Sequence, residues 1–136
     1  MLVFNNKINQ LFILTLFFII ISSSVQANNI KNSAVIFMYH KFDIPKYPST
    51  NITLDQFEKH LTEFSQEKYN VKSLDYIVDT IINDADLPNN TIGLSVDDAD
   101  RSFLTTAWPR FKQKGFPVTL FVTTSTIAEN NKNYLN

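Results

Sequence analysis

Cysteine is absent from the 136 residues of the chain, and neither sign of charge is in clear excess. Without cysteine there can be no disulfide, so burial of apolar side chains must stabilise the fold. The formal net charge is −1, and the 12 lysines and arginines are scattered, which gives no basic surface of the kind that binds nucleic acid. With 44% hydrophobic and 18% charged residues, the composition is that of a single globular domain.

The first 27 residues have the order of a secretory signal. Lys7 is their only charge, 11–21 is apolar except for one threonine, and small and polar residues lead to Ala27. We therefore predict a signal peptide at 1–27 and a mature chain at 28–136 that is exported to the periplasm, the cell envelope or the medium. An uncleaved membrane anchor is the alternative, but the apolar stretch is shorter than the roughly 20 residues of a spanning helix.

The first part of the mature chain contains an apolar run and two amphipathic segments. The run 34–39 predicts a strand that is buried on both faces, as in a parallel sheet, and the proline-containing segment 43–51 predicts a loop. A capping-box pattern begins a helix predicted at 53–66, and a serine begins a second helix at 73–82. Only a short strand fits between the two helices, at 69–72.

The second part continues in the same way. The apolar run 91–96 predicts another strand, and the stripe of apolar residues over 103–111 predicts a helix that is kinked or restarted at Pro109. Gly115 should end this helix, and 118–122 should form a further strand. Strands and helices thus alternate, which indicates an α/β fold with parallel strands. A closed (β/α) barrel takes about 250 residues, so the chain would be its N-terminal half.

Polar side chains directly follow two of these strands. His40 comes after the first, and Asp97 and Asp98 come after the strand 91–96. In α/β folds, functional groups gather where strands end, so these side chains are expected on one face of the sheet. Two adjacent carboxylates repel each other, and this repulsion is relieved when one binds a cation and the other holds or deprotonates a water molecule.

Other interpretations of the acidic cluster are open at this stage. Asp100 and Ser102 are good helix-capping residues, so the acids after the strand could simply cap the next helix. Asp98-Ala99-Asp100 also has the D-x-D form of haloacid-dehalogenase-type phosphatases, although Ser102 stands where that family has Thr or Val. A calcium loop would need a central glycine and a terminal glutamate, which the sequence lacks here. His60 lies within a predicted helix and is expected to be structural.

Two stretches resemble a known family. Residues 94–99, Leu-Ser-Val-Asp-Asp-Ala, and 114–122, Lys-Gly-Phe-Pro-Val-Thr-Leu-Phe-Val, are similar to the polysaccharide deacetylases of the NodB-homology, carbohydrate esterase type. That family has Thr-Phe-Asp-Asp-Gly, then a helix, then a Gly-hydrophobic-Pro-Ala-Thr-hydrophobic-Phe-Val strand. Residues 38–40, Met-Tyr-His, are similar to its opening strand. The resemblance covers nearly all of the mature chain and implies the N-terminal half of a distorted (β/α) barrel, a partial deacetylase domain at 28–136.

The resemblance implies a metal-dependent hydrolase that removes N-acetyl groups from a polysaccharide. By position in the motif, Asp97 would be the general base and Asp98 a metal ligand, with His40 as a neighbour in the active site. The cofactor would be a divalent metal ion, with zinc the first expectation. The partner would be an N-acetylated glycan such as peptidoglycan or an exopolysaccharide, and no nucleic acid.

The sequence departs from the family pattern in three places. Ser95-Val96 replaces Thr-Phe inside the strand, and Ala99 replaces the motif glycine, which restricts the backbone if φ must be positive there. The His-x-x-x-His pair that completes the family's metal site is absent, because the only histidines are His40 and His60. A downstream segment or a second chain would therefore have to complete the barrel. A non-catalytic remnant or glycan-binding module of the same fold is the alternative.

Overall fold

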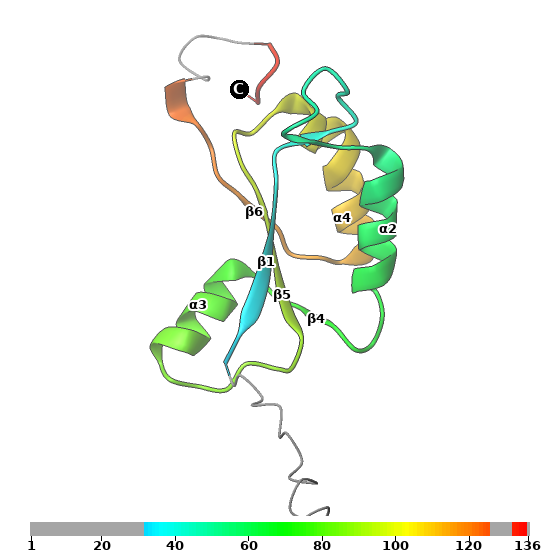
Figure 1. The fold of residues 1–136 in the computed structure, drawn as a ribbon. Helices are drawn as coiled ribbons and strands as arrows, with labels where there is room; N and C mark the ends of the chain where they lie inside the picture. Colours follow the sequence, from blue (N-terminus) through cyan, green and yellow to red (C-terminus); the bar gives the residue numbers. More distant parts are fainter. Residues whose placement is uncertain (1–31, 126–131, 136) are drawn as a thin grey trace, which may run out of the picture.

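The computed structural model describes residues 32–125 and 132–135 (Figure 1). The predicted signal peptide at 1–27 lies outside the described residues. Within the described part of the chain, no helix is both long and apolar enough to cross a membrane.

A parallel sheet forms the centre of the molecule, with β5 (Thr91–Val96) as its middle strand. β1 (Ala34–Tyr39) pairs with β5 along its whole length, from Ala34 opposite Thr91 to Tyr39 opposite Val96. β4 (Asn70–Val71) pairs with the start of β5, and β6 (Thr119–Leu120) pairs with its end. All pairs between the described strands are parallel, so the predicted α/β class is confirmed.

The first two helices begin where the sequence predicts. α2 (Leu54–Phe64) is preceded by Thr53, whose hydroxyl accepts the backbone N–H of Gln56 while the Gln56 side chain accepts the N–H of Thr53. This reciprocal pair satisfies two of the amides that a helix start leaves without partners. α3 (Leu74–Ile82) is capped by the side chain of Ser73 in the same way, without the reciprocal bond.

The third helical segment is in two parts, as the proline predicts. A π-helical turn, η1 (Phe103–Ala107), runs directly into α4 (Trp108–Lys114), with Pro109 in the first turn of α4. Proline is tolerated there because the first-turn amides have no partner inside the helix. Gly115 ends α4 with φ of 66°, a left-handed conformation that glycine adopts without strain.

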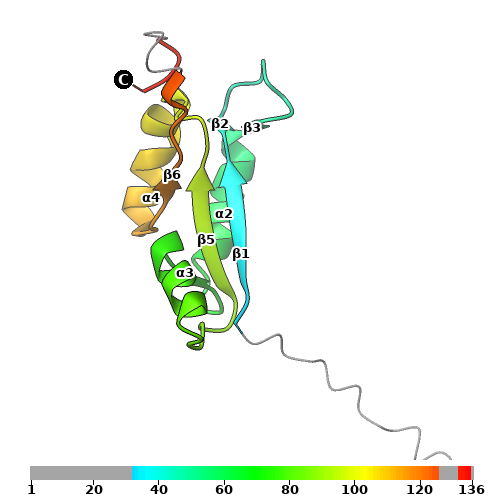
Figure 2. The ribbon, with the colours of Figure 1, turned by 90° about the vertical axis from the view of Figure 1, so that its left-hand side faces the viewer.

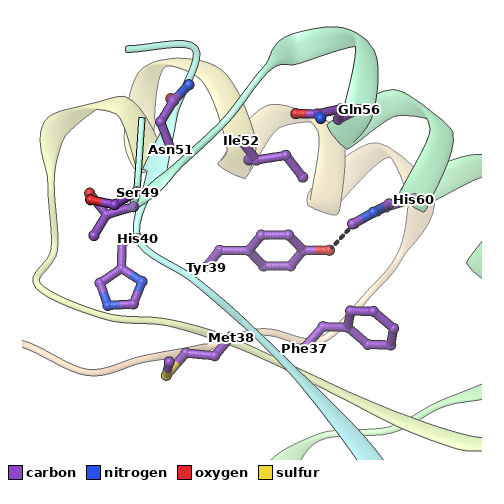
Figure 3. Close-up of a pocket in the computed structure, with 10 residues that line it drawn as sticks. Phe37, Met38, Tyr39, His40, Ser49, Asn51, Ile52, Gln56 and His60 are labelled. Atoms are coloured by element: carbon purple, nitrogen blue, oxygen red, sulfur yellow. Dashed lines mark hydrogen bonds between the residues drawn. The ribbon is translucent and has the colours of Figure 1, made fainter. Parts of the chain in front are cut away.

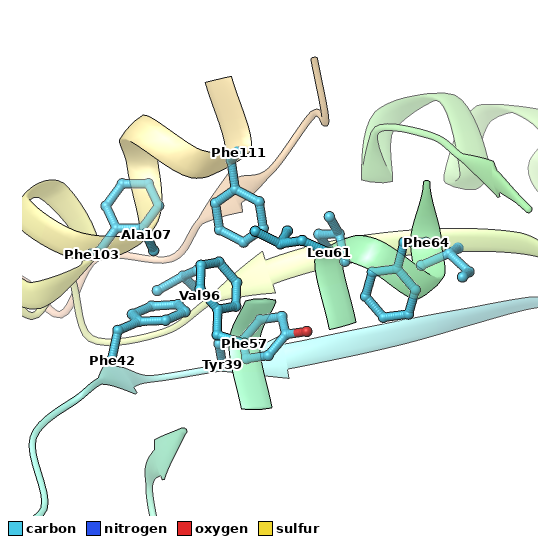
Figure 4. Packing of buried hydrophobic residues seen from close by; sticks show 11 residues of the cluster. Tyr39, Phe42, Phe57, Leu61, Phe64, Val96, Phe103, Ala107 and Phe111 are labelled. Carbon is cyan, nitrogen blue, oxygen red and sulfur yellow. The ribbon is translucent and has the colours of Figure 1, made fainter. Parts of the chain in front are cut away.

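α2 and α4 cover one face of the sheet and enclose the core (Figures 2 and 4). The core residues are mostly aromatic or branched: Tyr39, Phe42, Phe57, Leu61, Phe64, Ile92, Leu94, Val96, Phe103, Ala107 and Phe111. Because side chains alternate along a strand, Gly93 faces the opposite side, where α3 packs. A Cβ added to Gly93 would lie 2.5 Å from the Ile36 Cδ1 and 3.0 Å from the Ile77 Cδ1 of α3.

The structure corrects the expectation that β1 is buried on both faces. Val35 and Met38 are each 59% exposed, and only Tyr39 is fully buried in this strand. The reason is that, among the described strands, β1 pairs with β5 alone, so one of its edges is open. The apolar stripe of α3 is also largely exposed, since Ile77 is its one buried residue.

Two further strands were not predicted, and one is shorter than expected. β2 (Lys41–Phe42) and β3 (Asn51–Ile52) form a separate two-residue parallel ladder that closes the loop after β1. β6 covers two of the five residues predicted at 118–122. The short ladder depends on how the loop folds back, which a local sequence pattern does not contain.

Candidate active site

The parallel register of β1 and β5 brings His40 and Asp97 together. Tyr39 and Val96 are paired residues at the ends of the two strands, and the backbone N–H of Asp97 donates to the Tyr39 carbonyl at 2.8 Å. The next residue on each strand therefore lies at the same level of the sheet. The His40 Nε2 is 4.0 Å from the Asp97 Oδ2, and the two side chains are 25% and 30% exposed. The predicted juxtaposition is thus present, at a position open to solvent.

Asp98 is held in an unusual backbone conformation and by a side-chain hydrogen bond. Its φ is 69°, and that of Ala99 is 54°, so two successive residues without glycine's freedom are left-handed. The hydroxyl of Thr123 donates to the Asp98 Oδ1 at 3.1 Å. Thr123 is placed by the strand before it, since Phe121 N–H donates to the Val96 carbonyl at 2.8 Å.

Thr123 was not identified from the sequence. The signal was available, because this residue directly follows the predicted strand 118–122, and the carboxyl ends of parallel strands share one edge of a sheet. Its role in orienting Asp98 depends on the pairing of β6 with the end of β5, which the sequence pattern alone does not establish.

Asp100 has a structural position. It is buried, and its Oδ1 accepts hydrogen bonds from the Ser102 backbone N–H at 2.9 Å and from the Ser102 hydroxyl at 2.6 Å. The same Ser102 oxygen accepts the N–H of Phe42 at 3.0 Å, which ties this turn to β2. Asp100 thus fixes the turn that leads into the helical segment, whereas Ser102, at the start of η1, makes no side-chain capping bond of its own. The second carboxylate of a phosphatase-like D-x-D pair is therefore engaged in this turn.

His60 forms the wall of a cavity beside β1, as Figure 3 shows. Its Nδ1 is 2.9 Å from the Tyr39 hydroxyl, and burial raises the pKa of Tyr39 well above its usual range. The cavity has a volume of about 460 Å³ and extends past His40. His60 packs between rings of the core, which fits its expected structural role, and it reaches neither aspartate of the pair by any described hydrogen bond.

The donor set is too small for a complete zinc site. Among the described residues, no group of three or more His, Cys, Asp or Glu side chains could hold a metal ion. Structural zinc sites use four protein ligands and catalytic ones use three. Asp98 could supply one ligand, so the remaining ones are not present in the described part of the chain.

Known structures share this fold, although no family model and no curated protein matches the chain. The Streptococcus pyogenes deacetylase PplD in complex with acetate superposes with a TM-score of 0.66 at 21% identity, over 79% of this chain and 49% of that one. The de-N-acetylase from Aggregatibacter actinomycetemcomitans gives 0.61 at 20% identity, over 70% and 39%. IcaB from Ammonifex degensii gives 0.58 at 24% identity, over 65% and 37%.

These superpositions show that the chain has the NodB-like fold of the polysaccharide deacetylases. It spans about half or less of the length of the solved structures that it matches. The expectation of a partial (β/α) barrel with parallel strands is therefore confirmed at the level of the fold.

Proposed function

We propose that this chain, which has the NodB-like deacetylase fold, is part of an exported hydrolase that removes N-acetyl groups from a polysaccharide. The observation that carries the proposal is the 4.0 Å approach of His40 and Asp97 at the carboxyl end of paired parallel strands. Two of the matched structures are those of a deacetylase and a de-N-acetylase. The substrate class would be an N-acetylated glycan such as peptidoglycan or an exopolysaccharide.

Asp97 is the proposed general base. The Tyr39 carbonyl fixes the backbone of Asp97, and the Asp97 side chain is 30% exposed, so the carboxylate starts from a fixed position and is accessible to water. A positioned carboxylate of this kind can accept a proton from a water molecule that attacks the acetamide carbon. At 4.0 Å the imidazole of His40 makes no direct hydrogen bond to Asp97, so it would act on this carboxylate through a water molecule between them.

Asp98 is the proposed ligand of a divalent metal ion, with zinc the first candidate. Such an ion, when bound, polarises a carbonyl oxygen and acidifies a coordinated water molecule. Thr123 fixes one oxygen of Asp98, which leaves the other oxygen for a ligand bond. Because the described residues do not make a complete site, we propose that the remaining ligands come from a downstream segment or a second chain.

The test is release of acetate from N-acetylglucosamine oligomers with added zinc. It compares the chain alone with the chain produced together with the polypeptide encoded directly downstream. We expect release only from the combination, and expect Asp97→Asn to reduce the rate by at least about 100-fold, as for a general base. Asp79→Asn, which neutralises an exposed carboxylate on α3, is the matched control and should leave the rate unchanged.

A non-catalytic glycan-binding module is the competing function. It would bind the oligomers, release no acetate in either preparation, and lose no affinity on Asp97→Asn. Retention of full acetate release in Asp97→Asn would instead reject the role of this residue.

A further inference from the structure

A second cavity, which we call the Lys41 cavity, lies at the same end of the sheet as the aspartate pair. It has a volume of about 560 Å³ and is formed by the loop after β1, the turn before η1 and residues 132–134. Figure 1 shows the loop after β1 and the described C-terminal residues at this end of the sheet. Lys41 directly follows His40, and Asp100 of the cavity lies three positions after Asp97, so the cavity adjoins the ends of β1 and β5.

Positive charge exceeds negative charge in its lining. Four cationic side chains contribute to it, against two carboxylates: Lys41, Lys46, Arg101 and Lys132, against Asp43 and Asp100. The chain as a whole has a formal charge of −1, so this excess is local to the cavity. A cleft lined mainly by one sign of charge concentrates ligands of the other sign.

Lys41 is the buried cation of this cavity. The residue is 7% exposed, and its Nζ is 3.9 Å from the Asp100 Oδ2, longer than the 2.7–2.9 Å of a charge-assisted hydrogen bond. The other oxygen of Asp100 already accepts both bonds from Ser102. Within the described residues the Lys41 ammonium makes no hydrogen bond, although it carries three donors. No fully enclosed side-chain nitrogen or oxygen of the described residues lacks a hydrogen-bond partner, so the ammonium keeps some contact with solvent at the cavity. Its donors are therefore open to an acceptor that enters there.

Two tyrosine rings flank the same ammonium. The Lys41 Nζ lies 5.3 Å from the centroid of the Tyr47 ring and 5.9 Å from that of the Tyr134 ring. Cation–π contacts of this kind offset part of the cost of burial without using the N–H donors. Both rings line the cavity, so it combines a cation with flat apolar surfaces against which a sugar ring can lie.

We propose that the Lys41 cavity binds an anionic oxygen group, a carboxylate or a phosphate, carried by the N-acetylated sugar chain. This inference rests on the proposed function for the identity of the sugar, but the binding is measured separately from hydrolysis. The glycan would then be selected by its charge at a position next to the sugar that is deacetylated. Lys41 would donate the hydrogen bonds, and Lys46 and Lys132 would add attraction at the rim.

The experiment is calorimetric titration of the chain with three sugars. They are N-acetylglucosamine, which is neutral, N-acetylmuramic acid, which carries a carboxylate, and N-acetylglucosamine 6-phosphate. We expect at least one anionic sugar to bind about tenfold more tightly than the neutral one, and the stronger of the two identifies the group. Lys41→Met, which keeps an unbranched side chain of similar size and removes the charge, should abolish this preference without changing the affinity for N-acetylglucosamine.

Lys114→Met, on the exposed last turn of α4, is the matched control and should keep the preference. Lys46→Met tests the cavity without altering a buried residue and should reduce the preference by about two- to threefold. Thermal unfolding of each variant shows whether it is folded.

Equal affinity for all three sugars, or an unchanged preference in both Lys41→Met and Lys46→Met, would overturn the proposal. Acetate release without any charge preference would reject this inference alone, whereas charge-selective binding without acetate release would reject only the proposed function.

Discussion

Ala99 occupies a position whose backbone conformation favours glycine. Its φ of 54° places it in the left-handed region, directly after Asp98 at 69°. A residue with a Cβ pays roughly 1–2 kcal/mol in this region. The family pattern that the sequence resembles has glycine at this position. Because φ is positive here, alanine restricts the backbone of the loop.

Ala99→Gly should therefore stabilise the protein. Relief of the left-handed strain is offset in part because glycine has more conformational freedom in the unfolded chain. We expect the free energy of unfolding to rise by up to about 1 kcal/mol in urea denaturation. Ala107→Gly, at another buried alanine but in a right-handed helical conformation, is the control and should lose about 1 kcal/mol. Equal losses in both variants would contradict the strain argument.

The sequence predicted that His40 lies close to Asp97, but it did not predict the hydrogen bond from Thr123 to Asp98. The meeting follows from a simple rule, because both residues directly follow parallel strands that are in register. The bond from Thr123 needs the pairing of a two-residue strand with the end of β5, and propensities do not reveal such a short pairing. The proposed roles of the three site residues stay predictions until activity is measured.

Among the secondary-structure elements, α3 depends on one glycine of the sheet. The Ile36, Ile77 and Leu74 side chains crowd the site of a Cβ on Gly93, with distances of 2.5 to 3.0 Å to their Cδ1 atoms. These atoms are the ends of flexible side chains, so a methyl group could be accommodated by small shifts. A branched side chain could not.

Gly93→Val is expected to lower the free energy of unfolding by about 1–3 kcal/mol, the usual cost of overpacking. Because the clash lies between β5 and α3, hydrogen exchange should accelerate in α3 more than in α2. Ile82→Ala, at an exposed position of α3, is the control and should change stability by less than about 0.5 kcal/mol. A Gly93→Val variant as stable as the parent would show that α3 is free to move away from the sheet.

The helix starts were predictable because their causes are local. Thr53 with Gln56, and Ser73 at the start of α3, complete their hydrogen bonds within three residues of sequence. The exposure of β1 was not predictable from its apolar run, because burial depends on what pairs with its second edge and covers its second face. The ladder of β2 with β3 depends in the same way on contacts between distant residues.

The described sheet does not close into a barrel, because its edge strand β1 lacks a second partner among the described strands. β1 has one free edge among the described strands, and Val35 and Met38 are exposed beside it. An open apolar edge of this kind favours association with another strand. The three matched structures are at least twice as long as the portion shared with this chain, which supports the proposal that further polypeptide completes both the barrel and the metal site.

Weak zinc binding by the chain alone is the prediction that tests this incompleteness directly. The sequence contains no cysteine and two histidines, and His60 is engaged with the Tyr39 hydroxyl. Asp98 with at most one further donor cannot match the three or four protein ligands of zinc sites. We expect a dissociation constant above about 10 μM by calorimetry, and a further loss in Asp98→Asn, with Asp79→Asn unchanged. Because complete structural sites gain roughly 10–16 kcal/mol from the metal ion, nanomolar affinity in the isolated chain would mean that its own residues complete the site.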